Sequence, residues 1–171
     1  MIKRLPFLFA MTALAVSLSG CGFRPLYGTI GFDPAAQAIF ASIYVEPIDQ
    51  ERVGYELRNN LIDLLRSANR TQGSSYRLTV DVTETREGTA VQSDATITRY
   101  DLAFVAKYEL TDANLKSVLK GQETTLESFD VAQSPYSSLA GQADAERRAA
   151  QDMAEHIRID LGVHFSHAHV K

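Results

Sequence analysis

The chain has 171 residues, a formal net charge of −4 and a single cysteine. This length suits one ordinary domain with a sizeable core, and the acidic balance argues against nucleic acid as a partner. Because a lone cysteine cannot form an internal disulfide, packing alone must stabilise the domain.

Residues 1–20 have the parts of a bacterial secretory signal peptide. Lys3 and Arg4 supply the positive start, an apolar run follows, and small residues precede Cys21. The run has about 14 residues, fewer than the ~20 that a membrane-spanning helix needs. Cleavage before Cys21 would remove 20 of the 171 residues and two positive charges, and so would leave 151 residues with a net charge of −6.

The tetrapeptide Leu18-Ser19-Gly20-Cys21 is the pattern that a lipoprotein-specific peptidase cuts. We therefore predict Cys21 as the lipidation site, carrying acyl chains such as palmitate. Each buried methylene contributes about 0.8 kcal/mol, so that two or three chains make release from a membrane slow. Gly22 stands where an Asp would retain the protein at the inner membrane, which favours the periplasmic side of the outer membrane.

The segment after the cysteine is rich in proline and glycine. Residues 21–41 are therefore expected to form an extended, lipidated lead that precedes the domain. Residues 42–46 alternate over a β-rich run and predict a first strand that ends at Pro47. From Asp49, a plausible N-cap, apolar residues recur every three or four positions and predict an amphipathic helix that stops within 69–75.

Two long strands are predicted next. Residues 76–87 alternate between apolar and polar side chains, residues 88–94 read as a loop, and even-numbered residues from Tyr100 to Leu110 share one apolar face. The two strands are expected to pair antiparallel, with Ala103 and Val105 among the charges of the outer face.

A third strand and a second helix complete the pattern. After a turn at 112–114, residues 117–131 predict a strand whose apolar positions change parity, and we expect a bulge or twist near Gly121. Residues 134–138 read as a loop, and an amphipathic helix over 139–161 is expected to end at Gly162.

The order β-α-β-β-β-α predicts an α+β fold, with two helices on one face of a mostly antiparallel four-stranded sheet. The expected organisation is a signal peptide over 1–20, the lipidated segment over 21–41, the domain over 42–162 and a histidine-containing tail over 163–171. The exposed sheet face would be polar or covered by a partner.

The sequence contains none of the common catalytic motifs, and we expect neither an enzyme nor a cofactor. His164, His167 and His169 could bind a transition metal, but the tail holds no carboxylate, and no metal site is predicted. His156 and Asp152 read as an ordinary i,i+4 surface pair.

Three features together resemble the LptE family of lipopolysaccharide-assembly lipoproteins, in its alphaproteobacterial form. The mature chain opens as Cys-Gly-Phe-Arg-Pro-Leu-Tyr-Gly over 21–28, the elements follow the order above, and the last helix is introduced by Ser-Pro-Tyr-Ser-Ser-Leu over 134–139. That helix also contains Asp-Ala-Glu-Arg-Arg-Ala-Ala over 144–150. The resemblance covers essentially the whole mature chain.

The resemblance implies a non-enzymatic role as plug and assembly partner of the outer-membrane β-barrel LptD, which inserts lipopolysaccharide. It also implies contact with lipopolysaccharide through basic residues near the loop that joins the second and third strands, yet residues 89–94 hold no cation. The candidate contact residues for lipopolysaccharide or the barrel are Arg86, Ser93, Arg99, Val105 and Lys107. As alternatives, the three cations could be solvated strand charges, and Val105 could be simple edge packing.

Two other functions stay open. A lipoprotein with a cleft between helices and sheet could bind a lipid or peptide, although the large side chains of Tyr100, Phe104 and Tyr108 argue against an open cleft. A lipid-tethered hydrolase has no constellation of residues to support it.

Overall fold

A computed structural model describes residues 34–49, 51–66, 73–91 and 96–168. The chain divides into two units, residues 1–32 and 33–171, and all of the described residues belong to the second. The predicted signal peptide, Cys21 and Ser93 lie outside the described residues. Seven helices and strands are described, in this order: α2 (Pro34–Ala41), β1 (Ile43–Val45), α3 (Glu51–Leu65), β2 (Tyr76–Val91), β3 (Ile97–Asp112), β4 (Ser117–Asp130) and α4 (Pro135–Ala168).

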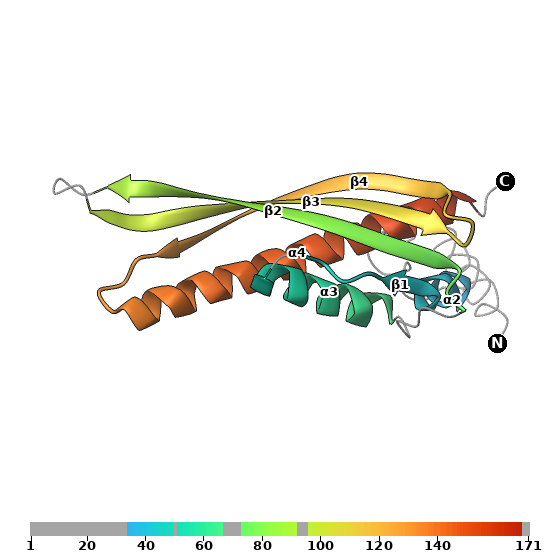
Figure 1. The fold of residues 1–171 in the computed structure, drawn as a ribbon, viewed down its shortest axis with the longest axis horizontal. Coiled ribbons are helices and arrows are strands. Elements are labelled where there is room, and N and C mark those ends of the chain that lie inside the picture. The colour runs from blue at the N-terminus through green and yellow to red at the C-terminus, as the bar shows by residue number, and fades with distance from the viewer. Residues whose placement is uncertain (1–33, 50, 67–72, 92–95, 169–171) are drawn as a thin grey trace, which may run out of the picture. The chain divides into compact units, whose positions relative to one another are not determined.

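The four strands form one mixed sheet in the order β1-β2-β3-β4. β1 runs parallel to β2, and helix α3 supplies the crossover connection that parallel neighbours need, whereas β2, β3 and β4 pair antiparallel. Helices α3 and α4 lie on the same side of the sheet (Figure 1). The predicted α+β class and the mostly antiparallel sheet are therefore confirmed.

The core lies between this sheet face and the helices. Alternate residues of the strands point toward the helices, and each helix contributes an apolar stripe at a spacing of three or four. The sheet contributes Leu78, Val80, Val82, Leu102, Phe104, Ala106, Tyr108, Leu110 and Phe129. The helices contribute Val53, Leu57, Leu61, Leu65, Ala145, Ala149, Ala150, Met153, Ala154, Ile157, Leu161 and Phe165.

Local backbone chemistry explains where several elements begin and end. α3 ends where Arg66 adopts a positive φ of 49°, a left-handed conformation typical of helix C-termini. α4 begins at Pro135, whose fixed φ suits the first helical position. The predicted turn at 112–114 is confirmed, since the Asp112 carboxylate accepts the backbone N–H groups of Asn114 and Lys116 at 2.8 and 2.9 Å.

Two expectations about helices were wrong. Residues 34–41 form the short helix α2, not an extended segment, and they add a third helix to the two predicted. Helix α4 also continues through Gly162 to Ala168, so that residues 163–168 belong to it and not to a tail. Glycine weakens a helix by only about 1 kcal/mol, and the buried Leu161 and Phe165 on either side keep this one packed.

Two expectations about strands also needed correction. Residues 88–91 belong to β2, because pairing with β3 continues beyond Gly88 through two register shifts. No bulge occurs at Gly121, since pairing between β3 and β4 is continuous from Leu119 to Asp130 and shifts only between Leu110 and Thr111. The apolar positions change parity because Leu126 points outward.

Candidate functional site

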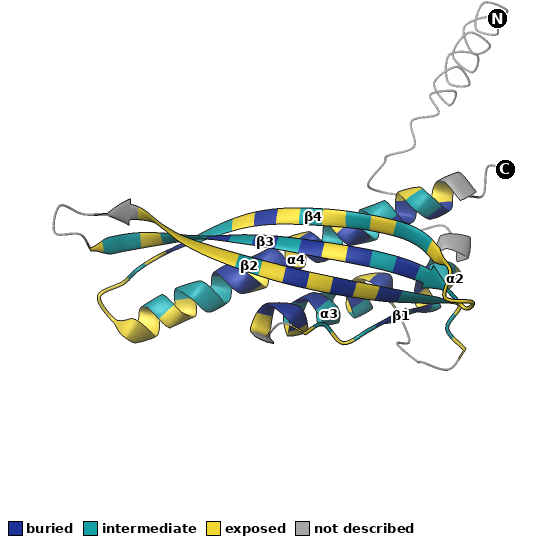
Figure 2. Cartoon of the chain, turned by 45° about the horizontal axis from the view of Figure 1, so that its top comes forward, coloured by how far each residue is buried: buried dark blue, intermediate teal, exposed yellow. Residues whose placement is uncertain are grey.

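The outer face of the sheet carries no helix within the described part of the chain. Figure 2 shows exposed residues alternating with buried ones along part of β2, and intermediate residues alternating with buried ones along much of β3. At its centre, Ala103 of β3 pairs with Leu126 of β4, and Val105 follows on the same face. Leu126 is 65% exposed. These three apolar side chains lie among threonines: Thr79, Thr83, Thr85, Thr111 and Thr124.

Several charges on this face are neutralised by neighbouring strands. Arg99 pairs with Asp130 at 3.1 Å, and Lys120 pairs with Glu109 at 3.1 Å. Direct ion pairing across strands leaves little net charge on the surface. The uncovered face is therefore polar, with ion-paired charges beside other exposed ones such as Asp81, Glu87 and Lys107, and with a small apolar centre.

The edge of this face near β1 is fixed by a further ion pair. Arg77 lies 2.5 Å from the Glu46 carboxylate, which also accepts the Thr79 hydroxyl at 3.0 Å. The hydrogen bond from Arg77 holds the pKa of Glu46 below its ordinary value. The folded state therefore favours the ionised form of the Glu46 carboxylate.

The structure separates the candidate contact residues. Val105 and Lys107 lie together on the outer face, two residues apart on β3, and Lys107 is exposed. Arg99 shares that face but is paired with Asp130. Arg86 lies on the opposite face, since even-numbered residues of β2 point toward the helices.

Arg86 is exposed, but it is not an isolated charge. Its guanidinium lies 3.9 Å from the ring centroid of Tyr100 and 5.1 Å from that of Phe129, and it donates to Gln142 of α4 at 3.2 Å. Cations over aromatic faces are attracted by the ring quadrupole. Arg86 therefore joins β2, β3, β4 and the start of α4, which no local sequence pattern signals.

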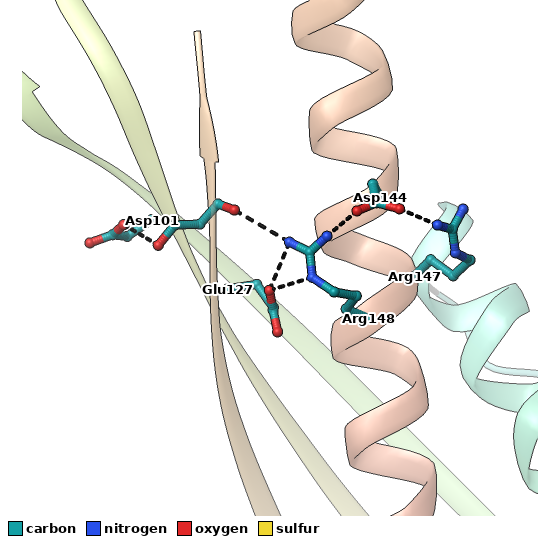
Figure 3. A network of polar contacts seen from close by, with 6 residues as sticks. Asp101, Glu127, Asp144, Arg147 and Arg148 are labelled. Carbon is teal, nitrogen blue, oxygen red and sulfur yellow. Dashed lines mark hydrogen bonds and ion pairs between the residues drawn. The ribbon is translucent and has the colours of Figure 1, made fainter.

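A polar network attaches α4 to β4 (Figure 3). Arg148 lies 2.9 Å from Glu127, bonds to Asp144 on its own helix, and donates to the Ser128 carbonyl oxygen at 3.4 Å. Ser128 in turn donates to Asp101 of β3 at 2.7 Å. The Asp-Ala-Glu-Arg-Arg stretch thus positions the helix on the sheet.

A second polar cluster lies farther along α4. The buried Tyr108 hydroxyl donates to Asp160, and His156 lies 3.5 Å from Glu123 of β4. Burial raises the pKa of Tyr108, as does the bond to Asp160. Burial also raises the pKa of Glu123, and Asp160 raises it further. His156 therefore contacts the sheet, beyond the surface role expected for it.

Within the described ranges, no three His, Cys, Asp or Glu side chains are placed to hold a metal ion. His164 belongs to α4, and its ring packs edge-on against Phe165 at 5.2 Å, while His169 lies outside the described residues. None of the described helices is both long and apolar enough to cross a membrane.

A hollow of about 390 Å³ lies between α3 and α4. Its lining comes from the two helices alone: Asn60, Leu64, Gln151, Asp152 and Glu155. Phe104 and Tyr108 are buried on the sheet face beneath the helices. The hollow is therefore not the cleft between helices and sheet that a lipid- or peptide-binding function would need.

Comparisons with known proteins point to one family. A crystal structure of a candidate lipoprotein from Caulobacter crescentus CB15 is 31% identical, with a TM-score of 0.64, and the match covers 77% of this chain and 96% of that one. Lipoprotein B from Nitrosomonas europaea (11% identity, 72% and 83% covered, TM-score 0.55) and rare lipoprotein B from Shewanella oneidensis (7%, 75% and 97%, 0.52) share the fold. No curated protein sequence matches the chain. The LptE family, described as lipopolysaccharide-assembly, matches residues 40–161, and the chain therefore belongs to the LptE family.

Proposed function

We propose that this chain is an outer-membrane lipoprotein that occupies the interior of the LptD β-barrel and supports its assembly, so that lipopolysaccharide can be inserted. Acyl chains on Cys21 would hold it to the periplasmic side of the membrane. The proposed role is non-enzymatic and needs no cofactor.

The observation that carries this proposal is the uncovered outer face of a sheet in a member of the LptE family. The interior of a large barrel carries polar side chains, which need hydrogen-bonding partners. The threonines and paired charges of the outer face can supply those partners without bringing a large uncompensated charge into the barrel. The centre at Ala103, Val105 and Leu126 can meet an apolar side chain of the wall.

Contact with lipopolysaccharide is a finer part of the same proposal. Lys107 and Arg99 are both exposed on the outer face, but Arg99 is paired with Asp130, and Arg86 is stacked on aromatic rings. A phosphate group would therefore meet Lys107 more readily than either arginine. Ser93 remains a predicted contact.

The proposal is tested by recovering the tagged, full-length chain from detergent-solubilised outer membranes. We expect LptD to be recovered with it, and a photo-reactive residue at position 105 to cross-link to LptD. The Cys21→Ser variant should lose lipid attachment and membrane association. Recovery of soluble periplasmic proteins alone, or identical cross-links in cells depleted of LptD, would contradict the proposal.

A further inference from the structure

Strand β4 is an open edge of the sheet. It pairs with β3 on one side, and no described strand pairs with its other side. Its 14 residues greatly exceed the usual strand length of about 5–6. A long edge presents a row of backbone donors and acceptors that another chain can pair with.

The pairing pattern identifies which backbone groups face this edge. The N–H of Val131 donates to Thr98 of β3 at 2.8 Å, whereas the carbonyl of Ser128 points the other way and accepts from Arg148. In an antiparallel pair these directions alternate along the strand. Because the register is continuous from Leu119 to Asp130, the even-numbered residues 120–126 direct their N–H and C=O groups away from β3.

Nothing in the described chain occupies that row. The edge-facing N–H and C=O groups of residues 120–126 make no hydrogen bond with α4 or with a described loop. Arg148 already donates to the edge-facing carbonyl oxygen of Ser128. This residue therefore marks one end of the unpaired stretch of β4, which we call the open window. The other end is Lys120, whose ammonium is directed to Glu109.

The usual defences of an edge are weak in this window. Proteins commonly protect an edge with proline, a bulge or exposed charges. Here the outward side chains of Gln122, Thr124 and Leu126 are uncharged and exposed, and the register shift lies outside the window. Glu123 and Glu127 point inward, where His156 and Arg148 contact them.

We propose that the edge of β4 from Lys120 to Leu126 accepts an extended segment of the barrel partner that is not already paired within its closed wall, an inference that rests on the proposed function. An extended backbone offers donors and acceptors at the same two-residue repeat, which neither a helix nor a lipid provides. An added strand would lie beside β4 and place its outward side chains next to Leu126. It would thereby widen the uncovered face that also holds Ala103 and Val105.

The test compares Thr124→Pro with Thr124→Ala in the full-length, lipidated chain. Both remove the same side chain, but only proline removes the N–H that faces the edge, and proline is tolerated where a strand N–H faces solvent. We expect Thr124→Pro to recover at least about tenfold less LptD than wild type, and Thr124→Ala to stay within about twofold, because only the lost pairing separates them.

The outcomes distinguish the possible failures. If wild type recovers LptD and Thr124→Pro recovers it equally, the inference is wrong while the proposed function stands. If wild type recovers no LptD, the proposed function fails and the inference fails with it. A wild-type homodimer that Thr124→Pro abolishes would assign the edge to a second copy and overturn the partner named here.

A second measurement covers the case in which Thr124→Pro fails to fold. Amide hydrogen exchange of wild type with and without bound LptD reports directly on this edge. We expect the amides of Gln122, Thr124 and Leu126 to exchange at least about tenfold more slowly in the complex, because they would then be hydrogen-bonded. Unchanged exchange in a complex that contains LptD would overturn the inference.

Discussion

The two faces of the sheet begin from the same strand pattern and end in different environments. On the inner face, Leu102, Phe104 and Leu110 are fully buried beneath the helices. On the outer face, Val105 and Lys107 alternate with them; Val105 is half-buried and Lys107 is exposed. Alternation therefore tells the two faces apart, while the helices decide which one becomes core.

The same difference separates two arginines. Arg86 faces the helices and lies against Tyr100 and Phe129, whereas Arg99 faces outward and pairs with Asp130. A charge on the inner face becomes part of the packing, and a charge on the outer face is balanced at the surface. The four predictions below test this contrast, from the largest expected effect to the smallest.

The largest effect is expected from Phe104→Ala, because Phe104 is 0% exposed at the centre of the inner face. Removal of a buried phenyl ring leaves a cavity and costs about 3–5 kcal/mol of unfolding free energy. The outer-face control Val105→Thr keeps the β-branched shape and should change stability by no more than about 0.5 kcal/mol. Denaturant unfolding followed by circular dichroism measures both, and equal losses would contradict the assignment of the two faces.

The next effect is expected from Gly121→Ala. Gly121 lies opposite Tyr108, and an added Cβ would meet the Tyr108 ring. The ring would have to leave its buried position and its bond to Asp160, at a cost of about 1–3 kcal/mol. Gln122→Ala, the neighbouring change on the outer face, should cost less than about 0.5 kcal/mol.

A double-mutant cycle checks the reason for that loss. In a Tyr108→Ala background the ring is absent, and Gly121→Ala should then destabilise the domain by much less. If the loss from Gly121→Ala is the same in both backgrounds, the close approach of Tyr108 is not its cause.

A smaller effect is expected from the two arginines. Arg86→Ala removes the contacts with two rings and with Gln142, and should cost about 1 kcal/mol. Arg99→Ala removes an exposed pair with Asp130 and should cost less than about 0.5 kcal/mol. The difference in unfolding free energy between these two variants is the measurement, and its absence would count against the stacked arrangement of Arg86.

The smallest effect is a contrast in pH dependence between two carboxyl groups. Glu123 has a raised pKa through burial and Asp160, so the folded state holds its proton more tightly than the unfolded chain. That stabilisation is complete below the unfolded pKa and is lost as pH rises through the folded pKa. Glu123→Gln should therefore match wild type in acid and become the more stable protein as pH rises.

Glu46 supplies the control of opposite sign. Arg77 lowers its pKa, so its stabilisation is present above the unfolded pKa and is lost as pH falls through the folded pKa. Glu46→Gln should be less stable than wild type at neutral pH and should match it in acid. Thermal unfolding across pH measures both variants. If the stability difference from wild type changed with pH in the same direction for both, this contrast would be contradicted.

The sequence predicted most of the fold because the deciding signals are local. The alternation in 76–87 and the spacing of three or four in 139–161 specify strand and helix without knowledge of their neighbours. The predictions were wrong where distant contacts outweigh local signals. Gly162 stays helical because Leu161 and Phe165 are buried, and residues 88–91 stay extended because β3 continues to pair with them.

The candidate site was harder to predict for the same reason. Val105 and Lys107 were correctly placed on the outer face, because one strand pattern fixes their direction. The contacts of Arg86 could not be predicted, since its aromatic partners lie on β3 and β4 and its hydrogen-bond partner lies on α4. Whether a charged side chain on a strand is paired or solvated depends on which distant segments of the chain contact it.

The sequence by itself therefore determined the order of the elements from β1 to α4 and the family, because both are recorded in residue types and short spacings. The tertiary structure alone decided where β4 is left open and which charges are neutralised. Those properties depend on the register between strands and on the position of α4, both set by contacts between residues far apart in the chain.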